Sequence, residues 1–302
     1  MDNSARPVRN DVARARGVEF LVLRHQQLRK GSHQKFYELS RDGVWPWFEK
    51  IGTRITGQWQ VIHPEGGGSE EYDEGYRLAR YASYEHWKNT RADASTELGG
   101  NGPDSEKNGQ ALRDRSAFSL GSARVYYLEG HMAPGGPYYM PGLAEDYEVG
   151  EESSSDARPV RNDVMRPGEE VVALRYWKIK KGAFEQFNDA SIEGVWPFFE
   201  KIGARIIGQW KVVHPEEGES EENAEFDEVV MMTRYASYEH WKATREGVEL
   251  GGNGPDYDAL VAALRLRRSL SLETSVEYLQ GYMYQSPPKF LPGLDERYRP
   301  VK

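Results

Sequence analysis

Two histidines in the first half of the chain have the side-chain chemistry to move a proton. His25 lies within the apolar stretch GVEFLVLRHQQL, and His63 directly follows the stretch RITGQWQVI. Because imidazole titrates close to neutral pH, both are candidate catalytic acid–base groups, with Tyr76 as a further polar group nearby. The alternative for His63 is a half-exposed side chain in a turn at the end of a strand.

Arginine and glutamine side chains in the same stretches could hold the anionic end of a ligand. Alternation along a strand sets Arg24 opposite His25, and Gln58 opposite Trp59. If the tryptophan face meets the helices, Arg24 and Gln58 point into a space between two sheets. An unpaired polar group there would cost ~1 to 3 kcal/mol, so these groups bind either a ligand or one another. The remaining candidate ligand-binding residues are Trp45, Tyr76, Arg80, Arg175, Gln209 and His214.

Most of these residues occur twice because the chain is an internal duplication. The segment GVWPWFEKIGTRITGQWQVIHPEGG from Gly43 returns as GVWPFFEKIGARIIGQWKVVHPEEG from Gly194. His63 returns as His214, but His25 is replaced by Tyr176. One half of a fused duplicate can specialise, so the first half is the preferred active half and His25 and His63 its catalytic residues. Neutral drift between aromatic core residues is the alternative.

Each half predicts the element order β-α-β-β-α-β. The strands are expected at residues 17–28, 54–64, 76–83 and 123–132, and their copies at 170–179, 205–215, 230–237 and 275–283. Pro46 and Pro197 interrupt the first helix of each half, so a kink or a new helix start is expected there. This order is that of a ferredoxin-like α+β unit, a layer of helices on a four-stranded antiparallel sheet.

One set of helices covers only one face of such a sheet. We therefore expect the two units to pack sheet to sheet within the chain, as a dimeric α+β barrel. The expected domains are residues 1–143 and 169–302, and the polar segment 144–168, which contains EESSSD, is the expected linker.

Three features together resemble the NIPSNAP family of the dimeric α+β barrel superfamily. They are an N-terminal strand, a helix ending FFEKIGARIIGQW, and a hairpin whose second strand reads RYAS before YEHW. The resemblance covers nearly all of both halves and implies the fold. The wider superfamily includes cofactor-free monooxygenases, muconolactone-type isomerases, haem-degrading enzymes and small sensor domains. The resemblance implies no catalytic residues for this chain.

Composition excludes several classes of partner and chemistry. The formal charge of -9 and the acidic loops EGGGSEEYDEG and EEGESEENAEFDE argue against nucleic acid or an anionic membrane as the partner. The absence of cysteine excludes thiolate nucleophiles and cysteine-bound metals, and no histidine pair in either half has metal-ligand spacing. No apolar run approaches the ~20 residues of a membrane span, and no secretory signal is recognisable. We expect a cytoplasmic protein without a metal or an organic cofactor.

These features predict a small-molecule enzyme that acts on an aromatic or polyketide-like substrate. The reaction would be proton transfer, elimination or oxygenation, as in a lyase, an isomerase or a monooxygenase. The alternative is a noncatalytic ligand-binding or scaffold protein of the NIPSNAP type. The expected partner is a small-molecule ligand or substrate, and a homo-oligomer is left open. The tryptophans are expected in the core, and His86 and His240, in the SYEHWK segments, at the surface.

Overall fold

The structure is a computed structural model that describes residues 20–81, 84–91, 98–132, 171–215, 221–235 and 237–283. These residues divide into two compact units. The first unit takes in the described residues up to Glu129 together with residues 281–283, and the second takes in those of residues 130–280. The expected linker at 144–168 lies outside the described residues. The sheet-to-sheet packing of the two units stays a prediction.

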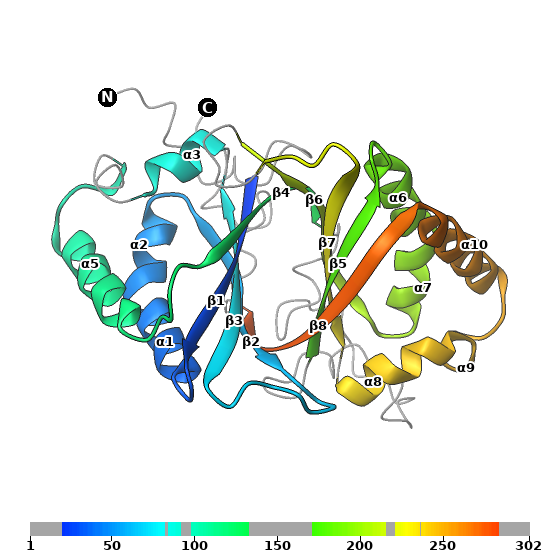
Figure 1. The fold of residues 1–302 in the computed structure, drawn as a ribbon, viewed down its shortest axis with the longest axis horizontal. Helices are drawn as coiled ribbons and strands as arrows, with labels where there is room; N and C mark the ends of the chain where they lie inside the picture. The colour runs from blue at the N-terminus through cyan, green and yellow to red at the C-terminus, as the bar shows by residue number, and fades with distance from the viewer. Residues whose placement is uncertain are drawn as a thin grey trace, which may run out of the picture. The chain divides into compact units, whose positions relative to one another are not determined.

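The first unit has the predicted ferredoxin-like order of elements. Its strands are β1 (Phe20–Arg29), β2 (Arg54–Ile62), β3 (Tyr72–Tyr81) and β4 (Arg124–Met132), and its helices are α1 (His33–Leu39), the π-helix η3 (Ser40–Val44), α2 (Trp45–Lys50), α3 (Tyr84–Asn89) and α5 (Pro103–Ser116). The strands pair antiparallel in the order β4-β1-β3-β2. Helices α1, α2 and α5 lie on one side of this sheet (Figure 1).

The second unit repeats this arrangement. Its strands are β5 (Val171–Lys180), β6 (Arg205–Val213), β7 (Phe226–Tyr235) and β8 (Ser271–Met283), and its helices are α6 (Phe184–Ala190), the π-helix η7 (Ser191–Val195), α7 (Trp196–Lys201), α8 (Tyr238–Ala243), the 3-10 helix η8 (Thr244–Glu246), α9 (Gly247–Gly251) and α10 (Pro255–Leu270). The order β8-β5-β7-β6 is again antiparallel. The α+β class and the two ferredoxin-like units are thus confirmed.

The prolines mark helix starts, as predicted. Pro46 is the second residue of α2 and Pro197 the second residue of α7, where the missing amide hydrogen costs little. A π-helix precedes each of these starts, and its wider turn is supported by the Ser40 hydroxyl, which donates to the Phe36 carbonyl over 2.7 Å. The Ser191 hydroxyl donates to the Phe187 carbonyl in the same way. The duplicated sequence therefore produces a duplicated helix break.

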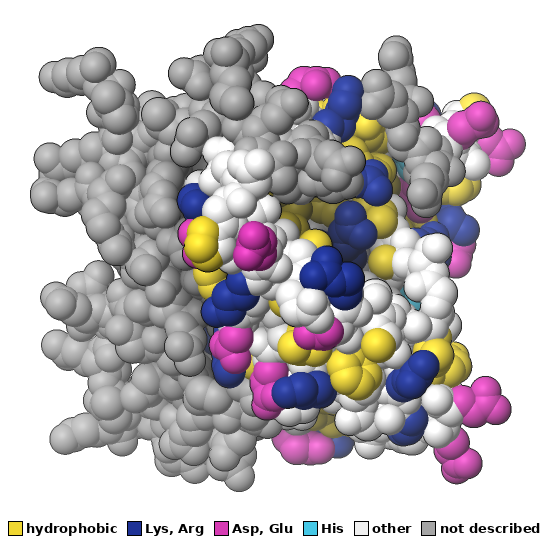
Figure 2. Space-filling view, turned by 90° about the vertical axis from the view of Figure 1, so that its left-hand side faces the viewer, with side chains coloured by type: hydrophobic (Ala, Val, Ile, Leu, Met, Phe, Trp, Pro, Cys, Tyr) yellow, Lys and Arg dark blue, Asp and Glu magenta, His cyan; other side chains and the backbone are white. Residues whose placement is uncertain are grey.

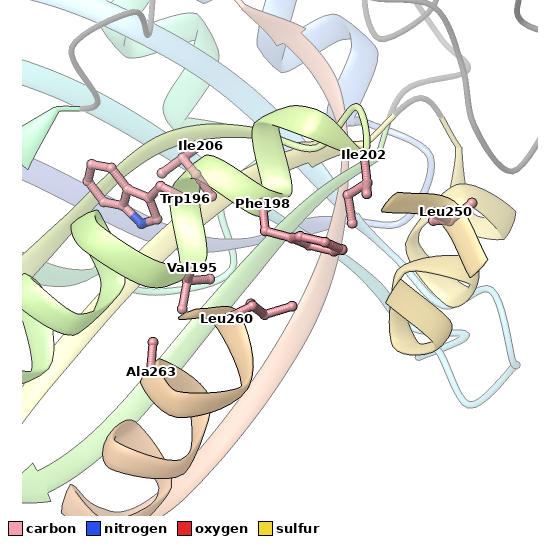
Figure 3. Close-up of a cluster of buried hydrophobic side chains, with 8 residues drawn as sticks. All are labelled: Val195, Trp196, Phe198, Ile202, Ile206, Leu250, Leu260 and Ala263. Atoms are coloured by element: carbon pink, nitrogen blue, oxygen red, sulfur yellow. The ribbon is translucent and has the colours of Figure 1, made fainter. Parts of the chain in front are cut away.

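The tryptophans lie in the core, as predicted. In the second unit Trp196 packs with the buried side chains of Val195, Phe198, Ile202, Ile206, Leu250, Leu260 and Ala263 (Figure 3). This cluster joins η7 and α7 to α9, α10 and the start of β6. Each large apolar side chain that is buried in this way stabilises the fold by about 1.5 to 3 kcal/mol.

The histidines of the short helices are buried, so the prediction that they lie at the surface is wrong. His86 is 1% exposed and His240 is fully buried. The ring Nε2 of His86 donates to the carbonyl oxygen of Ile51 over 2.8 Å, and that of His240 donates to the carbonyl oxygen of Ile202 over 2.8 Å. Carbonyls at the C-terminal end of a helix lack an intrahelical partner, and here a histidine supplies one. No described helix is long and apolar enough to cross a membrane.

Candidate functional site

The strand arginines and glutamine of the first unit lie on the sheet face that the helices cover. Arg77 of β3 is opposite Arg24 of β1 and opposite Gln58 of β2 in the antiparallel register, so the three side chains share one face. The guanidinium carbon of Arg77 lies 5.6 Å from the centre of the Phe48 ring in α2. Since Phe48 belongs to the helix layer, this face is the helix-covered one.

The second unit shows the same orientation. Gln209 donates from Nε2 to Oδ1 of Asn188 in α6 over 3.0 Å, and Arg175 lines a cavity together with residues of α10. The prediction that Arg24, Gln58, Arg175 and Gln209 point away from the helices is therefore wrong. Alternation along a strand defines two faces but does not say which one is covered. In this protein, contacts with the helices show which face is covered: Arg77 lies over the Phe48 ring, and Gln209 donates to Asn188.

A cavity of about 570 Å³ lies between the sheet and the helices of the second unit. Its apolar lining consists mainly of Trp177, Phe199, Met231, Trp241, Val261 and Leu264. Its basic lining consists of Arg175, Arg245, Arg265, Arg267 and Arg268, and none of the described lining residues is acidic. A cavity of this size can enclose a metabolite-sized molecule. Its chemistry suits an anion with an apolar body.

Arg267 is the most deeply placed charge of this cavity. It is 6% exposed, and its guanidinium carbon lies 4.9 Å from the Trp177 ring centre and 4.5 Å from that of Phe187. Burial lowers the pKa of Arg267 to about 9, and the positive charge of Arg175 lowers it further in the same direction. The side chain nevertheless stays charged at neutral pH. In the part of the chain that the structure describes, its Nε has no hydrogen-bond partner and no carboxylate pairs with it.

Tyr235 adds a neutral hydroxyl to the lining. Burial raises the pKa of Tyr235 to about 12, although the positive charge of Arg175 opposes this. The phenol therefore stays protonated at neutral pH and can donate or accept a hydrogen bond. It does not supply the missing negative charge.

His25 of the first unit lies on the opposite face of the sheet, in one row with Tyr76 and Trp59. The His25 and Tyr76 rings stack with their centres 4.5 Å apart, and Nε2 of His25 lies 3.1 Å from Oε1 of Glu74. Both partners of this ion pair are partly buried. The geometry at Nε2 of His25 is not that of a hydrogen bond, so the carboxylate is a close neighbour of the ring. An imidazole beside a carboxylate and a phenol is a group that can exchange protons with a ligand.

The second unit carries a different cluster at the equivalent place. The Tyr176 hydroxyl donates to Glu228, and Nε2 of His214 lies 3.4 Å from Oε2 of the same carboxylate. Glu228 is the copy of Glu74, since each lies two residues into its strand, in β7 and β3 respectively. Each unit therefore keeps a carboxylate with an aromatic partner on this face, although only the first has histidine in the first strand.

The structure separates Arg24 from Arg80, two residues that were predicted to hold one ligand. His25 is the sixth residue of β1, and His63 is exposed beyond the end of β2. A shared site of His25 and His63 stays a prediction. Arg80 pairs with Leu21 and so shares the face of His25, whereas Arg24 is on the other face. Arg24 and Arg80 therefore do not hold one ligand together.

Trp45 is buried and packs edge to face against Tyr37, with ring centres 5.6 Å apart. Its copy Trp196 belongs to the core cluster of the second unit. A role of Trp45 in ligand binding stays a prediction.

The arginines of the helices, of which Arg267 is the clearest, were not predicted from the sequence. The signal was present, because Arg267 in LRLRRS and Arg115 in LRDRS occupy the same position of the repeat. Both point back at a phenylalanine of the first helix, Arg267 at Phe187 and Arg115 at Phe36. A helix with many basic residues is usually exposed to solvent. The burial of one of its arginines can be seen only in the folded structure. Among the described residues no group of three or more acidic or histidine side chains is arranged for a metal ion.

No family model and no curated protein matches the chain. Similar solved structures include a candidate monooxygenase from Lactobacillus acidophilus NCFM, which is 9% identical with a TM-score of 0.48 over 89% of this chain and 100% of that one. An anthrone oxidase-like protein is 14% identical with a TM-score of 0.48 over 91% and 96% of the two chains. A chlorite dismutase variant from Candidatus Nitrospira defluvii is 11% identical with a TM-score of 0.35 over 90% and 95%. Likenesses of this size assign no reaction, substrate or cofactor to this chain.

Proposed function

We propose that the protein binds an anionic small molecule with an aromatic or aliphatic body in the cavity of the second unit. One observation carries the proposal: five arginines and no described acidic residue line a cavity of about 570 Å³. Arg267 is buried and Arg175 partly buried, whereas Arg245, Arg265 and Arg268 are exposed. The two less exposed charges are unfavourable without a counter-ion. A ligand carboxylate or a similar anion would supply it.

The two ends of such a ligand match two parts of the lining. The positive charge of Arg175 acts on Arg267, and both line the cavity, so an anionic group between them would accept hydrogen bonds from both. The rings of Trp177 and Trp241 and the side chain of Met231 would cover the body of the ligand. This is the class of aromatic or polyketide-like molecule that the sequence predicts.

The repeat supports further proposals about the chain as a whole. We propose that it is a tandem protein of the NIPSNAP type in the dimeric α+β barrel superfamily, because both units carry the same β-α-β-β-α-β order and the same duplicated motifs. The domain limits 1–143 and 169–302 and a cytoplasmic location belong to the same proposal.

Removal of either deep arginine should weaken binding. We expect Arg175→Met and Arg267→Met each to raise the dissociation constant for naphthoate about tenfold or more, because each removes a charge-assisted hydrogen bond of about 1.5 kcal/mol or more. Isothermal titration calorimetry measures this. Arg113→Met, at an exposed position of α5, is the matched control and should bind like the wild type. Naphthylmethanol, the neutral analogue, should bind much more weakly. Equal affinities for the acid and the alcohol would refute the proposal.

Catalysis without an organic cofactor is the second candidate function. The observation in its favour is the His25–Glu74 pair beside Tyr76. In the second unit a tyrosine stands at the position of His25. Here His25 would take a proton from a ligand or give one to it, and Glu74 would orient the ring and stabilise its charged form. Proton transfer, isomerisation or elimination needs no more than this. Oxygenation would also need molecular oxygen.

Loss of the imidazole should separate this candidate from binding alone. If the protein is an enzyme, His25→Gln should abolish conversion of molecules that the wild type converts, while calorimetry still shows binding in the cavity. Gln34→Ala, at an exposed position of α1, is the control and should convert them normally. The measurement is mass spectrometry of a metabolite extract incubated with each protein. Unchanged conversion by His25→Gln would exclude this residue as the acid–base group.

A further inference from the structure

Three arginines of the first unit are brought together on the helix-covered face of its sheet. Arg24 of β1 and Arg77 of β3 are direct neighbours in the register, and Arg115 reaches them from α5. Arg77 is 5% exposed, while Arg24 and Arg115 are partly buried. The positive charges of Arg77 and Arg24 lower the pKa of Arg115 to about 9, after burial as the larger cause. The three guanidinium groups therefore act on one another.

The described residues supply no negative charge for this cluster. Nη1 of Arg115 donates to the Ser40 hydroxyl over 3.1 Å, and its guanidinium carbon lies 4.9 Å from the Phe36 ring centre. The Nε atoms of Arg24 and Arg77 have no hydrogen-bond partner, and no ion pair joins any of the three to a described carboxylate. Acidic and basic side chains both occur among the described residues on the face seen in Figure 2. Among the described residues, no carboxylate forms an ion pair with this cluster.

The second unit provides an internal comparison at the same register. There Arg175 takes the place of Arg24 and Arg267 that of Arg115, again over a phenylalanine ring. The residue opposite Arg175 is Met231, where the first unit has Arg77 opposite Arg24. The second unit thus has two arginines on this face, beside a cavity. The first unit has three arginines on the equivalent face. Extra buried positive charge without a carboxylate is costly and calls for a more highly charged ligand.

We infer that the first unit holds a phosphate group at Arg24, Arg77 and Arg115. A phosphate monoester carries a charge of about −1.5 to −2 at neutral pH and offers three acceptor oxygens, one for each guanidinium group. A carboxylate offers two oxygens and a single charge, which suits the pair Arg175 and Arg267 better. The proposal goes beyond binding in the second unit and rests on different residues, so either can fail without the other.

The exchange of Arg77 and Met231 between the units gives a matched pair of variants. Arg77→Met should weaken binding of phenyl phosphate about tenfold or more, since it removes a charged donor from the site. In buffer without phosphate the same variant should unfold at the same temperature as the wild type or higher, because the remaining arginines repel less. Binding of naphthoate should not change. Met231→Arg should give the second unit a new affinity for phenyl phosphate.

Calorimetry and thermal unfolding of the full chain with inorganic phosphate, phenyl phosphate and benzoate test the inference. The inference is supported if the wild type binds either phosphate compound and Arg77→Met does not. If phenyl phosphate binds more tightly than inorganic phosphate, the ligand is an aromatic phosphate ester. If the two bind equally well, the ligand is free phosphate. Benzoate bound by this site as tightly as phenyl phosphate would overturn the inference. So would a lowered unfolding temperature of Arg77→Met in phosphate-free buffer together with unchanged phosphate binding, because Arg77 would then be a purely structural residue.

Discussion

Acidification from pH 6.5 to pH 4 should lower the free energy of unfolding by about 3 kcal/mol through His240 alone. Burial lowers the pKa of His240 to about 4 from its ordinary value of 6.5. The nearby charge of Arg205 acts in the same direction, and the hydrogen bond to the Ile202 carbonyl opposes it. Between these pH values the unfolded chain binds a proton that the folded chain does not, so stability is complete above pH 6.5 and is lost as the pH falls.

The variant His240→Gln isolates this contribution. Glutamine can donate its amide hydrogen to the Ile202 carbonyl and has no charge at any pH, so its stability should fall by about 3 kcal/mol less over the same window. Urea unfolding at several pH values, followed by tryptophan fluorescence, measures the difference. His33, whose pKa is lowered, and the carboxylates also titrate in this range. They contribute equally to both proteins, so their contributions cancel in the difference. Parallel pH profiles for wild type and variant would show that His240 titrates normally in the folded state.

The failure to foresee this histidine shows where the sequence stops being informative. SYEHWK has the alternation of a surface helix, and nothing in it says that the helix lies over the end of α7, where a free carbonyl is available. The element order and the helix starts at the prolines could be predicted, because periodicity and proline act within a few residues of themselves. Contacts between segments far apart in the sequence do not leave such a local pattern.

The candidate site shows the same division. The duplicated Arg24 and Arg175 were recognisable as interior arginines, but their side of the sheet was not, because a period of two fits either face equally. Arg267 and Arg115 lie on helices with many charged residues, so only the packing of α10 and α5 separates them from their solvated neighbours. The repeat itself was the unused information. Positions that keep arginine in both copies, such as Arg115 and Arg267, are better candidates than a histidine present in one copy.

The close contact between η3 and α5 gives the second large prediction. A Cβ atom on Gly43 would lie 2.3 Å from the Cβ of Ala111, and the copy Gly194 meets Ala263 at 2.5 Å. A methyl group on the backbone of a helix cannot move aside, so Gly43→Ala must push α5 away from the helix break. We expect a loss of about 2 kcal/mol, seen as a lower urea midpoint for the first unit. Gly109→Ala within α5 is the control and should not lower stability, because a Cβ there meets only the end of the Arg113 side chain, at 3.5 Å.

A compensating change tests the mechanism of that loss. Ala111→Gly removes the clashing atom and leaves the added methyl group 3.7 Å from the Cα of residue 111, an ordinary contact distance. By itself this substitution should cost about 1 kcal/mol of helix stability. If the Cβ clash is the cause, the double variant should be more stable than the sum of the two single losses by about 2 kcal/mol, which a double-mutant cycle measures. Additive losses would mean that Gly43 is needed for its backbone conformation, and that the spacing of η3 and α5 does not depend on the small residues between them.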